Sequence, residues 1–325
     1  MNIIDLHCDT ILYCLENDTD LLRCGGHINI DKLSAGGCLA QCFALLIAAK
    51  DNADFYLQGR NTPWDLYRHL LSYYQSCIAS ASNRIRPAFS VSDILRNRQA
   101  GFLSSVLTVE DCVEIDGILD RFDTVYSDGV RMMTLTWNYE NCIGFPNCAD
   151  QQAHTTNGLK PFGFDAVEKM NDLGIIVDVS HLSEAGFYDV ASQSKKPFVA
   201  SHSCCRALKD HPRNLTDLQL RTIADHGGVV GVNFFDKFAG RQDGSTSIED
   251  VVRHVLHIRE KAGIDSIALG SDFDGFESRL EFTDYTGYPC ILAALGKHFS
   301  DDEMEKICSG NFLRVFAENS HSDDV

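Results

Sequence analysis

The hydrophobic positions of this chain fall into short, nearly continuous runs that are separated by longer amphipathic stretches. The runs are rich in β-branched and aromatic residues, which is typical of strands buried on both faces of a parallel sheet. Eight such strands are predicted, at residues 2–7, 39–48, 102–110, 130–137, 174–181, 197–203, 228–235 and 267–273.

The stretches between these runs carry the signals of helices, at residues 63–83, 164–174, 247–263 and 300–310. Pro63 is well placed at a first helical turn, and the second of these stretches ends on a glycine that suits a C-terminal cap. Ser247 and Asp250 have the spacing of a capping box, and Ser300 and Glu303 repeat it.

Eight strands that alternate with helices indicate an α/β fold of the (β/α)8, or TIM barrel, type. A doubly wound open sheet is the alternative, but no glycine fingerprint follows the first strand. A chain of 325 residues could form two average domains, yet a barrel holds this length as one. We therefore predict a single barrel domain over residues 1–325, with a short flexible C-terminal tail at about 318–325.

The net charge of −18 narrows the range of partners. An acidic surface repels phosphate backbones and anionic membranes, so we expect no nucleic-acid partner. No apolar run is long enough for a transmembrane helix, and the N-terminus has no signal-peptide pattern, so we also expect no membrane anchor.

The thirteen cysteines are scattered, and many lie in the apolar, strand-like runs. No C-x-x-C pair occurs, and neither Cys204-Cys205 nor Cys142…Cys148 has the spacing of a zinc ribbon. Free cysteines behave as small buried hydrophobes and persist in a reducing compartment. We therefore expect a cytoplasmic protein.

Residues that can bind a metal or take part in catalysis stand where the predicted strands end. In a barrel these carboxyl ends meet on one rim, where active sites are built from several strands. The residues are His7 and Asp9 at the end of the first strand, Glu110 at the end of the third, Trp137 and Asn138 at the end of the fourth, His181 at the end of the fifth, His202 at the end of the sixth and Asp272 at the end of the eighth.

Each of these residues also has a simpler interpretation when it is taken alone. The H-x-D pair at the first strand could be an ordinary hydrogen bond, and His181 or His202 could be a core histidine with satisfied partners. Glu110 could cap the following loop, and Asp272 could form a turn with Asp274. Their joint position on one rim favours a metal site.

The ligand types narrow the choice of metal. Three histidines with carboxylates suit zinc or a neighbouring divalent ion. Three histidines and two carboxylates exceed what one tetrahedral ion needs, whereas a pair of ions about 3.5–4 Å apart uses all of them. We therefore predict two Zn²⁺, or two other divalent ions, in each chain.

Several motifs in order give the chain a resemblance to a known family. They are DLHCDT, AGGCLAQCFA, the Glu110 segment, GVRMMTLTWN, GLKPFG, MNDLGIIVDVSH, ASHS with Arg213-Asn214 eleven residues on, GSDFDG and GNFLRVF. Together they resemble the membrane dipeptidase (renal dipeptidase, peptidase M19) family of binuclear zinc peptidases in the amidohydrolase superfamily. The similarity covers nearly the whole chain, and it implies a barrel of the metal-dependent hydrolase type.

The resemblance implies a role for each metal-site residue. His7 and Asp9 would hold one zinc ion, His181 and His202 would hold the other, and Glu110 would bridge the two. Its bridging position makes Glu110 a catalytic residue as well as a ligand.

The resemblance also implies the residues that bind substrate. Arg213 matches the arginine that binds the free carboxylate of the substrate, which suits a planar, two-pronged cation, and Asn214 belongs to the same motif. Asp272 matches the aspartate that holds the substrate amino group and transfers protons. In mammalian relatives a histidine follows the L-T of the fourth strand, but here Trp137 stands there, with one neutral donor and no acceptor.

We therefore expect a zinc-dependent dipeptidase, in which a metal-bridging hydroxide attacks the peptide carbonyl and Asp272 passes its proton to the leaving amine. One alternative is a binuclear amidohydrolase that cuts another small amide, such as an N-acyl amino acid. Another is a non-catalytic metal-binding protein, against which the intact ligand set argues. The expected partner is a dipeptide or small amide, and a homodimer is left open.

Overall fold

The computed structural model of the chain describes residues 1–47, 62–241 and 244–320. Eight parallel strands close into a barrel in the order β1-β2-β4-β5-β6-β7-β8-β10, and β10 pairs again with β1. These strands are β1 (Ile3–Asp5), β2 (Cys38–Leu46), β4 (Leu103–Glu110), β5 (Val130–Thr134), β6 (Ile176–Asp178), β7 (Val199–Ser203), β8 (Val229–Val232) and β10 (Ile267–Leu269). The predicted TIM barrel and its eight strands are confirmed.

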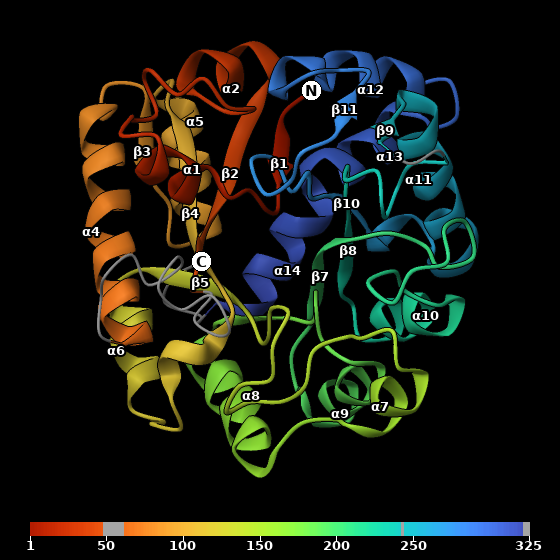
Figure 1. Cartoon of the computed structure of the whole chain (residues 1–325). Helices are drawn as coiled ribbons and strands as arrows, with labels where there is room; N and C mark the ends of the chain where they lie inside the picture. The colour runs from red at the N-terminus through yellow and green to blue at the C-terminus, as the bar shows by residue number, and fades with distance from the viewer. Residues whose placement is uncertain (48–61, 242–243, 321–325) are drawn as a thin grey trace.

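Helices surround the barrel (Figure 1). They are α1 (Thr10–Glu16), α2 (Ile30–Gly36), α4 (Pro63–Ser80), α5 (Val91–Gln99), α6 (Arg121–Ser127), α7 (Gln151–Thr156), α8 (Pro161–Leu173), α9 (Glu184–Gln193), α10 (Asp217–Asp225), α11 (Ile248–Ala262), α12 (Tyr288–Leu295), α13 (Asp301–Glu305) and α14 (Asn311–Asn319). The predicted capping boxes at Ser247 and Ser300 are both formed. Gly174 ends α8 in the left-handed conformation, as the sequence predicts.

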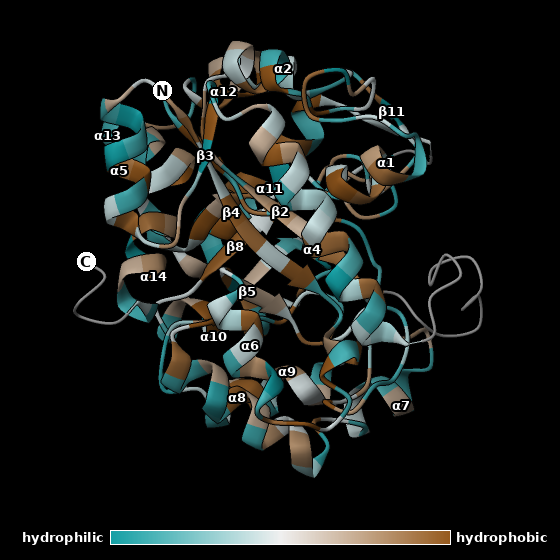
Figure 2. Ribbon diagram, turned by 90° about the vertical axis from the view of Figure 1, so that its left-hand side faces the viewer, coloured by the Kyte–Doolittle hydropathy of each residue, from teal (hydrophilic) through white to brown (hydrophobic). Residues whose placement is uncertain are grey.

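The inside of the barrel is closed at one end by α14. Phe312, Val315 and Phe316 on this helix pack against an apolar layer that several barrel strands contribute, including Ile4, Val106, Met132, Ile176, Val199 and Val229. Figure 2 shows α14 at the end of the barrel opposite the arrowheads of the strands. Since this end is plugged by apolar side chains, the carboxyl ends of the strands form the open rim.

The structure differs from the sequence predictions at several element ends. Most strands are shorter than predicted, and β3 (Ile85–Pro87), β9 (Ser245–Thr246) and β11 (Arg279–Leu280) are additional short strands. Gly310 does not end a helix: its φ of −58° is helical, and a π-helical turn over Lys306–Gly310 joins α13 to α14.

Two predictions fall partly beyond the described residues. Residue 48 of the predicted strand 39–48 lies outside them, as do residues 321–325 of the predicted tail. The first residues of that tail, Glu318 and Asn319, belong to α14. Among the described helices, none has the length and apolar character needed to cross a membrane.

Candidate metal centre

The site residues stand at the carboxyl ends of the strands: Glu110 and His202 lie within β4 and β7, and the others follow their strands in irregular backbone. His181 and Asp272 have φ values of 68° and 63°, in the left-handed region that non-glycine residues rarely adopt. Such strain persists only where the surrounding structure holds it, and it concentrates at functional sites. Gly275 lines the same rim, and a Cβ atom there would clash with the carboxylates of Asp9 and Asp272.

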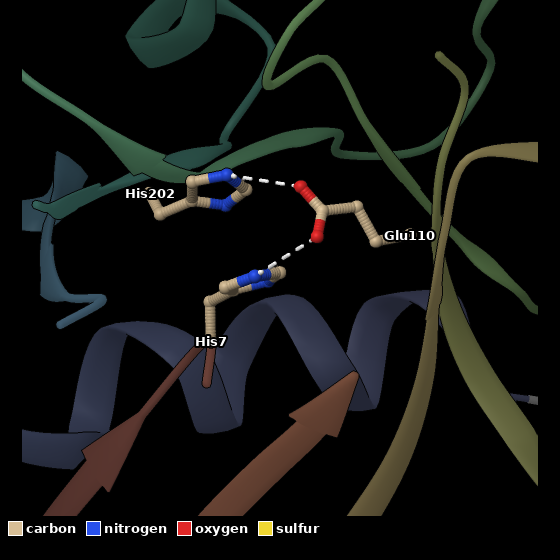
Figure 3. A group of neighbouring side chains, drawn as sticks. All are labelled: His7, Glu110 and His202. Atoms are coloured by element: carbon tan, nitrogen blue, oxygen red, sulfur yellow. Dashed lines mark ion pairs between the residues drawn. The ribbon is translucent and has the colours of Figure 1, made fainter. Parts of the chain in front are cut away.

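The carboxylate of Glu110, at the end of β4, lies at the centre of three histidines. Its Oε1 is 3.1 Å from His181 Nε2 and 3.5 Å from His202 Nε2, and its Oε2 is 3.4 Å from His7 Nε2. His7 Nε2 is also 3.4 Å from Asp9 Oδ2. Figure 3 shows the two oxygens of Glu110 directed at His202 and His7, which lie on one side of it. The structure thus brings together all five residues predicted as metal ligands.

Hydrogen bonds at Nδ1 of His202 and His181 place the ring proton on that nitrogen, so that the lone pair of Nε2 faces the centre. Ser201 donates its only proton to Asp178 (2.5 Å), so its oxygen accepts from His202 Nδ1 at 2.7 Å. His181 Nδ1 lies 3.2 Å from the side-chain oxygen of Asn138 and donates to it. Both rings therefore direct unprotonated Nε2 atoms inward.

These two Nε2 atoms are only 3.1 Å apart. Burial, together with nearby positive groups, lowers the pKa of both histidines well below the usual value, so neither ring takes up a second proton at neutral pH. Two lone pairs and a carboxylate oxygen that converge without a proton between them repel one another. A bound cation removes this repulsion, which is why the arrangement fits a metal ion.

The second half of the centre, at His7, also carries an excess of negative charge that a cation would balance. Burial alone would lower the pKa of His7, but the carboxylates of Glu110 and Asp9 outweigh it and raise that pKa well above the usual value. His7 Nε2 and Asp9 Oδ1 are buried without a hydrogen-bond partner among the described residues. Ligand atoms of His7, Asp9 and Asp272 lie within 4.8 Å of one another, as do those of His7, Glu110 and His202. Both groups suit a divalent ion.

Asp272 lies at the edge of this centre, with its Oδ1 at 3.9 Å from His7 Nε2. Its other oxygen accepts a hydrogen bond of 2.8 Å from the side-chain amide of Asn233. Burial raises the pKa of Asp272 to about 6, and His7 and Asn233 oppose that rise. A carboxylate with a pKa near neutrality can both take and release a proton at working pH.

A cavity of about 440 Å³ opens onto the centre. Its lining includes Glu110, His181, Asp272, Trp137 and Arg213. The indole ring of Trp137 lies against His181, with 6.5 Å between the ring centroids. The cavity is therefore lined by three of the candidate metal ligands, Asp9, Glu110 and His181, together with Asp272 and Arg213.

Of the residues predicted to bind substrate, Asn214 is the one that does not line this cavity. Its side-chain amide donates to the backbone carbonyls of Lys209 (2.8 Å) and Phe238 (2.9 Å), and the residue is buried. These bonds hold together the two loops that carry Arg213 and Phe238. A direct contact of Asn214 with substrate stays a prediction.

Two buried carboxylates support the site and were not predicted. Asp178 accepts hydrogen bonds from Thr134, Ser180 and Ser201, which ties the ends of β5, β6 and β7 together. Asp5 ties β1 to β10, because it accepts hydrogen bonds from the backbone N–H groups of His7 and Ser271 and from the hydroxyl of Tyr288. The signal for both was a carboxylate inside an otherwise apolar strand, since a buried charge requires partners.

Comparisons with known proteins agree with this geometry. Dipeptidase tcpJ of Claviceps purpurea is 30% identical over 303 residues, which cover 90% of this chain and 69% of that protein. An uncharacterized protein encoded in the pqqA 5′ region of Klebsiella pneumoniae is 37% identical over 263 residues, covering 78% of this chain and 96% of its own.

A solved structure gives the same fold over nearly the whole length. The metallopeptidase of Rhodobacter sphaeroides, solved with a phosphinate mimic of the dipeptide L-Ala-D-Ala, superposes with a TM-score of 0.89 at 26% identity. The match covers 98% of this chain and 99% of that one. Residues 1–324 match the membrane dipeptidase family, peptidase family M19. With a fold, a candidate metal centre and a sequence that all agree, the chain belongs to the M19 dipeptidase family of hydrolases.

Proposed function

We propose that this protein is a dipeptidase that binds two Zn²⁺ ions and hydrolyses the peptide bond of free dipeptides. The observation that carries the proposal is the convergence of unprotonated His181 and His202 with His7 and Asp9 around Glu110, beside a cavity that also holds Arg213. The dipeptide mimic bound to the metallopeptidase of R. sphaeroides supports the same substrate class.

His7 and Asp9 would hold one ion, His181 and His202 the other, and Glu110 both. Two metal ions held in this way would supply a water of lowered pKa as the nucleophile and would polarise the carbonyl that is attacked. The histidines and carboxylates would keep the ions in place, and the hydrogen bonds that His202 and His181 donate to Ser201 and Asn138 hold these two rings in the required tautomer.

Asp272 would manage the proton of the reaction. With a pKa raised to about 6 by burial, it is mostly a carboxylate at neutral pH and can accept a proton from the nucleophile. The same group can return that proton to the nitrogen of the leaving amine. Asn233 holds one carboxylate oxygen, which leaves the other directed at the centre.

A panel of dipeptides with free and N-acetylated amino groups tests this function. A dipeptidase should cleave the free compounds and lose most of its activity on the acetylated ones. An enzyme that prefers N-acyl amino acids would show the opposite ranking. No cleavage by the zinc-loaded protein of any compound would refute the enzymatic proposal.

We expect the purified protein to contain close to two equivalents of a divalent metal, measured by elemental analysis. Removal of the metal with a chelator should lower Tm by about 5–10 °C, because a tightly bound ion stabilises the folded state by several kcal/mol. Zn²⁺ should restore the original Tm. One equivalent or none after reconstitution would contradict the two-ion proposal.

We expect Trp137→Phe to keep most of kcat and to change which side chains are accepted. Trp137 lines the cavity against His181, and two bound ions would already neutralise the developing negative charge. If its N–H instead stabilised the oxyanion, the substitution would lower kcat by about 10²–10³. A loss of that size, with metal content and KM unchanged, would make Trp137 a catalytic residue.

The thirteen cysteines are all free thiols, and most are buried. This supports the proposal that the protein works in a reducing compartment such as the cytoplasm.

A further inference from the structure

One wall of the cavity is cationic, although the chain has a net charge of −18. His211 and Arg213 reach it from the loop that follows β7, and Lys237 reaches it from the loop that follows β8. The rings of Phe235 and Phe238 form the apolar surface between these groups, with their centroids 5.0 Å apart.

Neither strong cation of this wall forms an ion pair with a carboxylate of the described residues. Arg213 donates to the backbone carbonyl of His202 (3.1 Å) and the hydroxyl of Ser203 (3.4 Å), both neutral, and its buried Nε has no partner among the described residues. Lys237 is exposed and lies over the ring of Phe235 at 5.5 Å, and no ion pair joins it to any other described residue. Two cations therefore face the cavity with charge available for a ligand.

His211 adds a hydrogen-bond donor between them. Its Nδ1 accepts the backbone N–H of Arg213 at 3.1 Å, so its proton is on Nε2. Burial, followed by the positive charges of Arg213, Lys209, Lys237 and Arg206, lowers the pKa of His211 and keeps the ring neutral. The ring is packed in place against Phe238, with 4.8 Å between centroids.

Carboxylates line the cavity as well. Asp9, Glu16 and Asp272 are among its lining residues, and Glu16 is exposed. A bound dipeptide would thus lie with its amino group toward the carboxylates and its carboxyl end toward the cations. An acidic side chain is repelled at the first residue and attracted at the second.

We infer that the preferred substrates are dipeptides whose second residue is acidic, with the α-carboxylate on Arg213 and the side-chain carboxylate on Lys237 and the Nε2–H of His211. A dipeptide with a neutral second residue has one carboxylate for two cations, and it leaves Lys237 unpaired. The inference rests on the proposed function, because it assigns the second carboxylate-binding position of that same site.

The test compares near-isosteric substrates of the zinc-loaded enzyme. We expect kcat/KM to be about tenfold higher for Ala-Glu than for Ala-Gln, an effect between those of an exposed and a buried charge pair. Each compound is measured with an L- and a D-residue in the second position. Glu-Ala should be a poorer substrate than Gln-Ala, because its side-chain charge would lie at the amino end, with the carboxylates of Glu16 and Asp272.

Three variants assign the preference to one residue. In Lys237→Met the ratio of Ala-Glu to Ala-Gln should fall to near one, and Lys237→Arg should retain most of it. Lys297→Met removes the same charge from an exposed position on the α12–α13 connection and should keep the full ratio. Equal losses on Ala-Glu and Ala-Gln in Lys237→Met would overturn the inference, since Lys237 would then attract any carboxylate.

Binding without turnover separates this inference from the proposed function. Phosphinate mimics of Ala-Glu and Ala-Gln are titrated into the zinc-loaded wild type and Lys237→Met by calorimetry. If no dipeptide is hydrolysed, the proposed function fails, while the ratio of the two Kd values still decides the specificity. A ratio of about tenfold that Lys237→Met abolishes supports the inference, and a wild-type ratio near one overturns it.

Discussion

Replacement of Glu110 by alanine is expected to lower kcat/KM for a dipeptide at least about a thousandfold, through the loss of several kcal/mol of charge stabilisation by the metal ions. Glu110 is the only one of the five proposed ligands whose carboxylate reaches both halves of the centre, since Oε1 faces His181 and His202 while Oε2 faces His7. Without it, neither half retains a full ligand set.

The matched comparison is Asp9→Ala, which removes a carboxylate from the His7 half alone. Elemental analysis should find both metal equivalents reduced in Glu110→Ala but only one in Asp9→Ala. Circular dichroism confirms that each variant is folded. If Glu110→Ala retained two equivalents and most of its activity, the bridging role would be wrong.

The barrel could be predicted because its strands obey a simple physical rule. A strand covered on both faces must be predominantly apolar, and the eight runs from 2–7 to 267–273 satisfy this condition. The small strand Ile85–Pro87 was missed because only Ile85 is buried and the run has no apolar pattern. Local hydrophobicity carries no signal for so short a pairing.

The ends of the strands were predicted less well, for a reason that concerns the site itself. The apolar run at 174–181 continues past the regular strand Ile176–Asp178, because Val179 is buried while the backbone already leaves the sheet. His181 then takes a φ of 68°. An apolar run in a sequence indicates burial, whereas the backbone angle of a single non-glycine residue is set by tertiary contacts.

The candidate ligands could be predicted as a group, but their supporting residues could not. His7, His181 and His202 stand out as polar residues at strand ends. Asp178 and Asn233 lie within or directly after apolar runs, and their partners are distant in sequence, such as Thr134 for the first and Asp272 for the second. Which polar groups meet inside the barrel depends on strand order and register, which the sequence pattern does not specify.

Replacement of Arg213 by alanine is expected to cost about 2–4 kcal/mol of transition-state binding for a dipeptide, or roughly 30- to 1,000-fold in kcat/KM. Arg213 is 6% exposed, makes no ion pair with any described residue, and lines the cavity with candidate metal ligands. A substrate carboxylate would supply the two acceptors that its planar fork requires.

A dipeptide with an amidated C-terminus distinguishes a substrate-binding role of Arg213 from a purely structural one. The wild type should strongly prefer the free carboxylate, whereas Arg213→Ala should cleave the free and amidated forms at similar rates. Arg213→Lys keeps the charge but loses the two-pronged geometry, so it should recover only part of the preference. Because Arg213 also donates to the backbone of His202, a structural role is the competing explanation. Equal losses on both substrates would favour it, since a displaced metal ligand impairs every peptide alike.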